Sequence, residues 1–167
     1  MTGDLLNLNL GCGLDTPEGF VNVDRVGLAG VDVVADLDLA PWPWKDGAAA
    51  YIKASHVFEH VRDPVVFMTE AWRVLALDGL LDIRVPGGGY IGPGVWLPHE
   101  HGFTDPTHVR NCTPHTWDYW IPGTALFEAY GAGLGGGRGG ACFALHDLTL
   151  AGEQGEELRA VLQKVDD

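Results

Sequence analysis

The sequence lacks the features that mark membrane, secreted and disulfide-rich proteins. Its 167 residues contain no run near the ~20 apolar residues of a membrane span. The start, Met1-Thr2-Gly3-Asp4, has neither the basic nor the apolar segment of a secretion signal. Its three cysteines, Cys12, Cys112 and Cys142, are odd in number and show no paired-ligand spacing. We therefore expect a cytoplasmic protein with reduced thiols and no membrane contact.

Positive charge is also scarce. Ten Lys and Arg face 23 Asp and Glu, which gives a formal net charge of −13, and the basic residues form no cluster. Phosphate backbones repel such a chain, so duplex nucleic acid is not an expected partner. The composition, 46% hydrophobic and 20% charged, is that of a globular protein. At this length we expect a single domain over residues 1–167.

The hydrophobic pattern predicts seven strands. They are expected at Leu5–Leu10, Phe20–Val23, Val31–Ala35, Ala48–Ala54, Leu80–Val85, Cys142–Leu150 and Leu158–Val165. The segment Leu158–Val165 also fits the spacing of a helical stripe, but we expect a strand there. Crossovers separate the first five strands, whereas a short polar turn joins the last two. This indicates an α/β fold, a Rossmann-like parallel sheet with a C-terminal antiparallel hairpin and few helices.

Helix signals are few. Asp63-Pro64 pairs an N-cap residue with a proline at the first helical position. Met68, Ala71, Trp72 and Leu75 then follow at helical spacing, and Asp78-Gly79 is expected to end this helix with a glycine cap. Two short helices are expected from Thr113-Pro114 to about Trp120 and over Ala125–Tyr130.

Two loop regions stand out. Residues 87–122 are rich in Gly, Pro, His and aromatics and show little periodicity, which is typical of a functional loop, here a substrate region. Residues 131–140 contain seven glycines, and we expect this segment to be mobile.

The most informative motif is Gly11-Cys12-Gly13 at the end of the first expected strand. Glycine lets the backbone approach a bulky ligand because it carries no Cβ. Asp24 ends the second expected strand, where a carboxylate can accept hydrogen bonds from both ribose hydroxyls. The ordered pair predicts an adenosine site.

Several motifs together resemble those of class I S-adenosylmethionine-dependent methyltransferases. The matching segments are Leu8-Asn9-Leu10-Gly11-Cys12-Gly13, Asn22-Val23-Asp24, Ala35-Asp36-Leu37, Ser55-His56-Val57-Phe58-Glu59-His60 and Leu80–Pro86. The resemblance covers roughly the first 86 residues, and it implies the seven-strand methyltransferase fold with S-adenosylmethionine as cofactor.

The resemblance also implies roles for individual residues. Gly11, Cys12 and Gly13 are expected to pack against the methionine part of the cofactor, and Asp24 to hold the ribose. Asp36 is expected to accept from the adenine amino group, with the backbone of Leu37 beside it. Ser55 and His56 are expected near the transferable methyl group.

One departure from the common pattern is clear. Only ten residues separate Gly13 from Asp24, and Pro17 and Gly19 are among them. The usual helix after the first strand cannot fit there. The same shortening occurs in small predicted methyltransferases with a Gly-Cys-Gly…Gly-Phe-x-Asn-Val-Asp pattern.

Methyl transfer needs alignment of donor and acceptor and, for many nucleophiles, a base. His56, Asp105 and His108 are the candidates for binding the acceptor or removing its proton. The cluster from His99 to His115 could hold a metal, but its spacing matches no compact zinc template. His56 also stands where metal-dependent relatives carry a glutamate, so we expect no metal to be needed.

The expected function is methyl transfer to a small molecule, a sugar or glycan, or a protein. A non-catalytic S-adenosylmethionine-binding or metal-binding module of the same fold is the alternative. A dinucleotide oxidoreductase is disfavoured, because position 16 of Gly-x-Gly-x-x-Gly is Thr and no helix follows to hold a pyrophosphate.

Overall fold

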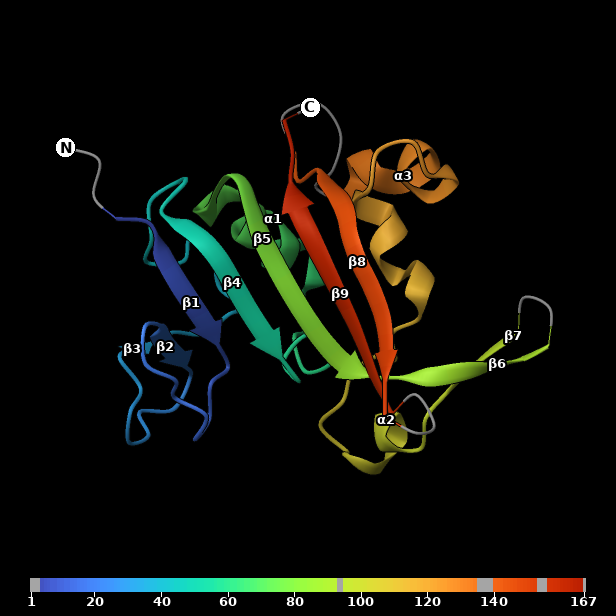
Figure 1. The fold of residues 1–167 in the computed structure, drawn as a ribbon, viewed down its shortest axis with the longest axis horizontal. Helices are drawn as coiled ribbons and strands as arrows, with labels where there is room; N and C mark the ends of the chain where they lie inside the picture. Colours follow the sequence, from blue (N-terminus) through green and yellow to red (C-terminus); the bar gives the residue numbers. More distant parts are fainter. Residues whose placement is uncertain (1–3, 93–94, 135–139, 153–155, 167) are drawn as a thin grey trace.

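A computed structural model describes residues 4–92, 95–134, 140–152 and 156–166 (Figure 1). Its main sheet has seven strands in the order β3-β2-β1-β4-β5-β9-β8, and β6 and β7 form a separate two-stranded ribbon. The strands are β1 (Leu6–Leu10), β2 (Val21–Asp24), β3 (Val33–Val34), β4 (Ala49–Ser55), β5 (Leu75–Pro86), β6 (Gly88–Gly92), β7 (Val95–Pro98), β8 (Phe143–Ala151) and β9 (Glu157–Lys164). The helices are α1 (Pro64–Val74), α2 (His101–Thr104) and α3 (Ala125–Tyr130), with 3₁₀ segments η1 (Pro114–Trp120) and η2 (Gly131–Leu134).

The pairing confirms the α/β fold expected from the sequence. Strands β3, β2, β1, β4 and β5 run parallel to one another. Strand β9 pairs antiparallel with both β5 and β8, which closes the sheet with the expected hairpin. The last segment is therefore a strand and not a helix. In parallel α/β sheets, ligands bind beyond the carboxyl ends of the strands, so β1, β2 and β4 direct attention to one edge of the sheet.

Helix α1 begins where the sequence predicts and ends earlier. The Asp63 side chain accepts from the backbone N–H groups of Val65 and Val66, and Pro64 occupies the first turn. The predicted end at Asp78-Gly79 is wrong, because the helix stops at Val74 and Leu75 is already extended. Leu75 pairs with Ala49 of β4, so sheet pairing overrides the helical pattern at this residue. Asp78 instead adopts a left-handed conformation inside β5, with a φ of 63°.

The core lies on one face of the sheet. Alternate residues of β4, β5 and β9 are buried there against α1, which lies behind the sheet in Figure 1. An aromatic chain continues this core, with ring centroids of Phe58 5.5 Å from Phe67 and 5.2 Å from Trp117. Trp117 and Trp120 of η1 are 0% and 3% exposed, so these two aromatics serve packing.

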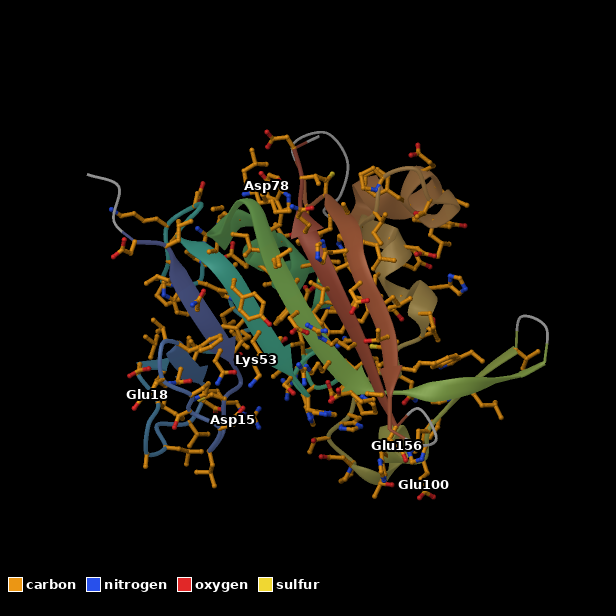
Figure 2. The ribbon with its side chains drawn as sticks, viewed as in Figure 1. Asp15, Glu18, Lys53, Asp78, Glu100 and Glu156 are labelled. Atoms are coloured by element: carbon orange, nitrogen blue, oxygen red, sulfur yellow. The ribbon has the colours of Figure 1, made fainter. Side chains whose placement is uncertain are left out.

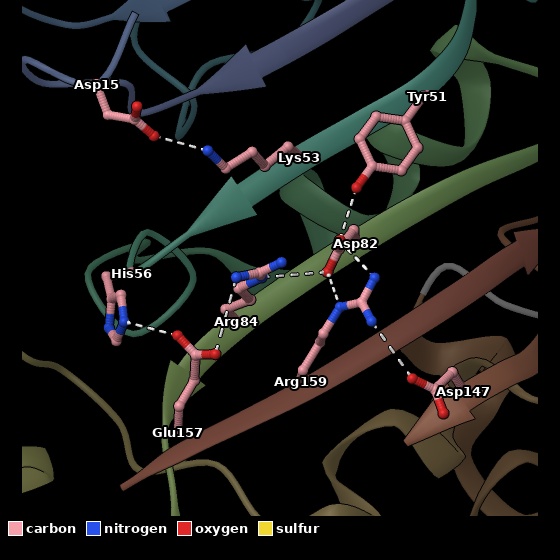
Figure 3. A network of polar contacts seen from close by, with 9 residues as sticks. All are labelled: Asp15, Tyr51, Lys53, His56, Asp82, Arg84, Asp147, Glu157 and Arg159. Carbon is pink, nitrogen blue, oxygen red and sulfur yellow. Dashed lines mark hydrogen bonds and ion pairs between the residues drawn. The ribbon is translucent and has the colours of Figure 1, made fainter. Parts of the chain in front are cut away.

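The opposite face of the sheet is polar. No described residue forms a helix between β1 and β2 or between β2 and β3, which confirms the shortened first crossover. On this face the Asp82 carboxylate, 1% exposed, binds the Arg159 guanidinium through two hydrogen bonds of 2.9 Å and accepts from Tyr51 Oη at 2.6 Å (Figure 3). Ion pairs therefore cover strands on which helices would otherwise pack.

The segment 87–122 is more regular than the sequence indicates. It contains the β6–β7 ribbon, the single turn α2 and the 3₁₀ helix η1. The helix expected near Thr113 is thus confirmed as a 3₁₀ helix, and the one at Ala125–Tyr130 as α3. Residues 131–134 form η2, whereas 135–139 of the glycine-rich segment lie outside the described residues.

Candidate functional site

A cavity of about 470 Å³ opens at the carboxyl ends of β1, β2 and β4. This edge is the end of the sheet where Glu100 and Glu156 lie, opposite Asp78 (Figure 2). The cavity is lined by Gly11, Asp24, Arg25, Val26, Leu28, Ala35, Asp36, Leu37, Asp38, His56, Val57, His60 and Val61. Its volume is within the range of pockets that hold a nucleoside-sized ligand.

Gly11 lines the cavity, and its backbone explains why this position is glycine. Its φ is +58°, a backbone conformation that residues other than glycine rarely adopt. A Cβ at this position would lie 2.3 Å from Cγ2 of Val57, in the loop after β4. The tip of β1 can therefore approach the β4–α1 loop closely only with glycine there.

Asp24 is held in place by the backbone on both of its oxygens. Oδ2 accepts from the N–H of Gly13 at 2.9 Å, and Oδ1 accepts from the N–H of Val26 at 2.9 Å. A carboxylate has about four acceptor positions, so each oxygen keeps one for a ligand. The geometry suits two adjacent hydroxyl groups, the pattern of a ribose.

The far end of the cavity combines a polar rim with apolar walls. Asp36 is exposed, and its Oδ1 accepts from the N–H of Asp38 at 3.0 Å. Val26 and Leu28 line the same cavity, although they are 51% and 40% exposed. Exposed apolar side chains beside a polar rim fit an aromatic base that stacks on them and donates from its edge.

Three of the residues expected at the cofactor do not line this cavity. Cys12 is 6% exposed, and burial, followed by the nearby charge of Asp24, raises the pKa of its thiol. Gly13 contributes its N–H to Asp24, and nothing lies within 4 Å of the position of its missing Cβ. Ser55 ends β4 next to the lining residue His56.

A second cavity, of about 630 Å³, shares a wall with the first. His56 and His60 line both cavities. The other lining residues are Glu59, Pro86, His101, Thr104, Asp105, Pro106, His108 and Glu156. All three predicted acceptor-side residues, His56, Asp105 and His108, therefore meet in one place.

Comparison with known proteins identifies the fold. Residues 8–83 match the family model described as "Methyltransferase domain". A methyltransferase of Archaeoglobus fulgidus described as SAM-dependent aligns with a TM-score of 0.62 and 16% identity, over 97% of this chain and 87% of that one. The chain thus has the fold of S-adenosylmethionine-dependent methyltransferases, and its residues 8–83 are similar to a methyltransferase domain.

Two further solved structures show the breadth of this methyltransferase fold. The 1,6-didemethyltoxoflavin-N1-methyltransferase of Burkholderia thailandensis, solved with S-adenosylhomocysteine, aligns with a TM-score of 0.59 and 15% identity, over 96% of this chain and 71% of that one. The [4+2]-cyclase SpnF aligns equally well, at 0.59 and 15% identity over 99% and 76%. Comparison with curated proteins gives no match.

Within the described residues, no helix is long and apolar enough to span a membrane.

In this methyltransferase fold His56 has an unusual setting. Its φ is +54°, and its side chain is about half exposed. Nδ1 lies 3.2 Å from Glu59 Oε1. Nε2 lies 3.4 Å from Glu157 Oε2, the contact drawn in Figure 3. The hydrogen bond to Glu59 raises the pKa of His56, and burial partly opposes it. The ring thus lies between two carboxylates on the wall that the two cavities share.

Arg110 attaches the segment 87–122 to the loop after β4. Its Nη1 donates to the carbonyl oxygens of Phe58, at 2.6 Å, and of Val61. Val109 adds a backbone hydrogen bond to the Glu59 carbonyl at 2.9 Å. Burial lowers the pKa of the Arg110 guanidinium. These bonds bring His108 beside His60, from which it is 48 positions away in the sequence.

The cluster from His99 to His115 does not assemble as one unit. Cys112 is 2% exposed in the core, and burial raises the pKa of its thiol to about 12. His115 pairs with Asp118 at 2.9 Å instead. Sequence reasoning also missed Val26, which lies two positions after Asp24 and lines the first cavity. An apolar residue in a polar turn right after the strand-end acid was the available signal.

Proposed function

We propose that this chain transfers the methyl group of S-adenosylmethionine to an acceptor bound in the second cavity. The family and the fold support S-adenosylmethionine-dependent methylation. The cofactor supplies an activated methyl group on a sulfonium. The single observation that carries the proposal is Asp24, whose carboxylate is held by two backbone N–H groups at a cavity that starts at Gly11 and ends at Asp36.

The described residues fit this cofactor. The two remaining acceptor positions of Asp24 match the ribose hydroxyls. Asp36, beside the backbone of Leu37, can accept from the adenine amino group, and Val26 and Leu28 can pack against the base. We propose that Cys12, Gly13 and Ser55 support the cofactor from outside the cavity lining, and that Gly11 lies against its methionine part.

The acceptor side is assigned to His56, Asp105 and His108. In-line displacement requires the nucleophile to face the methyl group, and His56 lies on the wall between the two cavities. The hydrogen bond from the Thr107 hydroxyl lowers the pKa of Asp105, so this residue stays a carboxylate and suits an acceptor's hydroxyl or amino group. The acceptor class we propose is a small molecule, a glycan or a protein.

The test is calorimetric titration of variants with S-adenosylhomocysteine. Asp24→Ala is expected to weaken binding by roughly 1–3 kcal/mol, because ribose hydroxyls lose their partner. Asp32→Ala is the matched control, since the Asp32 carboxylate also accepts from one backbone N–H, that of Asn22 in β2, but Asp32 does not line the cavity. Equal affinities for the two variants would remove Asp24 from the cofactor site.

The acceptor assignment has its own readout. Asp105 lines the second cavity but not the first. Once an acceptor is identified, Asp105→Asn is therefore expected to lower turnover and to leave S-adenosylhomocysteine affinity unchanged. A parallel loss of both would contradict the separation of the two cavities.

A further inference from the structure

Three side chains with metal-binding groups converge in the second cavity. Glu59 and His60 come from the loop after β4, and His108 comes from the segment 87–122. One ligand atom from each residue lies within 4.8 Å of the others. We propose that Glu59, His60 and His108 bind a divalent transition-metal ion, with Zn²⁺ as the best fit. This site goes beyond the methyl transfer proposed above and does not depend on it.

Glu59 provides the strongest indication. The residue is 1% exposed. Its Oε1 lies 3.2 Å from His56 Nδ1, whereas its buried Oε2 has no hydrogen-bond partner among the described residues. Burying a carboxylate oxygen without a hydrogen-bond partner costs free energy, and a bound cation would remove this cost. A metal ion bound to Oε2 would satisfy it.

The hydrogen bonds of His60 fix the tautomer that a metal requires. The Thr107 hydroxyl lies 2.6 Å from Asp105 Oδ1, and it must donate there because a carboxylate only accepts. The same hydroxyl oxygen lies 2.9 Å from His60 Nδ1. With its one hydrogen committed to Asp105, the hydroxyl can only accept from His60. Nδ1 therefore carries the proton, and Nε2 of the neutral ring keeps its lone pair for a metal.

A different contact gives His108 the same tautomer, with the proton on Nδ1. Its Nδ1 lies 3.1 Å from the backbone carbonyl oxygen of Gly102, which can only accept. Nδ1 therefore donates, and Nε2 of the neutral ring keeps its lone pair. Metal-binding histidines typically donate their second ring N–H to a carbonyl or a carboxylate system in this way. Both histidines of the cluster thus have the outer contacts of metal ligands.

The positions of the two histidines are set by packing that does not involve a metal. Their ring centroids are 4.7 Å apart at an interplanar angle of 70°. Arg110 and Val109 bind the carbonyl oxygens of the β4–α1 loop on one side of Glu59 and His60. Ligands about 2.1 Å from one ion lie at most about 4.2 Å apart, so ligand atoms that already lie within 4.8 Å of one another need only a small closure to share one ion.

The ligand types select the metal class. Two imidazoles and one carboxylate form a common three-residue set for Zn²⁺, which leaves a further position for water or a substrate oxygen. Mg²⁺ prefers oxygen ligands and fits poorly. The sequence favours metal-independent chemistry because His56 replaces an acidic ligand. The fold brings in His108 as a ligand that the sequence spacing does not reveal.

The test measures metal binding to the chelator-treated, purified full-length chain. Calorimetric titration is expected to show one Zn²⁺ per chain and no comparable binding of Mg²⁺. His60→Ala and His108→Ala are expected to weaken Zn²⁺ binding by more than about 100-fold, and Thr107→Val, which removes only the outer contact, by about 10–100-fold. His101→Ala is the matched control, because His101 lines the same cavity outside the cluster.

A second readout covers variants whose folding is in doubt. Glu59→Gln removes the negative charge from the buried Oε2, which has no hydrogen-bond partner among the described residues, so the metal-free protein is expected to keep or raise its melting temperature. The rise in melting temperature that Zn²⁺ gives the wild type is expected to disappear in this variant. The proposal is overturned if the wild type binds no Zn²⁺, or if the three ligand variants bind it as well as His101→Ala does. Zn²⁺ binding without S-adenosylhomocysteine binding would reject the proposed cofactor and keep the metal site.

Discussion

Replacing Gly11 by alanine tests why the β1 loop needs glycine. The substitution places a Cβ where φ is +58°, which costs roughly 1–2 kcal/mol for a residue with a side chain. The same Cβ would lie 2.3 Å from Cγ2 of Val57, a side chain that is 8% exposed and cannot swing into solvent. Relieving such an overlap in a packed site costs typically about 1–3 kcal/mol.

Gly13 provides the matched control because its φ of +54° is nearly the same. Nothing lies within 4 Å of its missing Cβ, so Gly13→Ala bears only the backbone cost. We therefore expect Gly11→Ala to lower the free energy of unfolding by about 2–5 kcal/mol and Gly13→Ala by about 1–2 kcal/mol. The difference measures the contact with Val57.

Urea unfolding, followed by tryptophan fluorescence, gives these free energies. Adding Val57→Ala removes the methyl groups that overlap, so the double variant is expected to show a favourable coupling of about 1–3 kcal/mol. Equal losses for the two glycine variants, or a coupling near zero, would refute the close approach of β1 to the β4–α1 loop.

Two further predictions concern the ionic groups of the sheet and the helix. Burial, with the hydrogen bond to Asp82, raises the pKa of Tyr51 to about 12. Because the unfolded phenol ionises near 10, this group makes stability fall between about pH 10 and 12, and Tyr51→Phe is expected to flatten that limb in alkaline melting curves. The hydrogen bond from Arg73 lowers the pKa of Glu70 below its ordinary 4.5. Its contribution is therefore present above pH 4.5 and lost as the pH falls below it; acid unfolding with the same midpoint in Glu70→Gln would contradict this.

The sequence predicts most of the sheet because local signals and pairing agree there. The helix start predicted at Asp63-Pro64 is confirmed, because an N-cap depends only on residues within one turn of the helix start. Local sequence signals do not identify the residue at which α1 ends. Asp78-Gly79 has the composition of a helix cap, but Leu75 pairs with Ala49, and this long-range contact decides the boundary.

The polar face of the sheet has a signal in the sequence. Asp82 and Arg84 alternate with the apolar Leu81, Ile83 and Val85, a period-2 pattern of a strand with one apolar face and one polar face. The short connections from β1 to β3 omit the helices that would cover this face. The polar residues of β5 and the short connections between β1 and β3 thus have one physical cause, a sheet face that no helix covers.

The candidate site was predictable only in part. Gly11, Asp24 and Asp36 lie within two residues of the carboxyl ends of neighbouring strands, so topology alone brings them to one cavity. The meeting of His60 with His108 depends on Arg110, whose bonds to the β4–α1 loop join residues about fifty positions apart. No spacing rule gives such a contact, which is why the sequence presents two separate histidine clusters.

The most direct test of the central claim is calorimetric titration of the wild-type chain with S-adenosylhomocysteine, with NAD as the control ligand and with chelator present and absent. The account predicts one S-adenosylhomocysteine per chain with micromolar affinity, retained in chelator, and no binding of NAD. Absence of S-adenosylhomocysteine binding, or equal binding of NAD, would contradict the assignment of the Gly11–Asp24–Asp36 cavity to this cofactor.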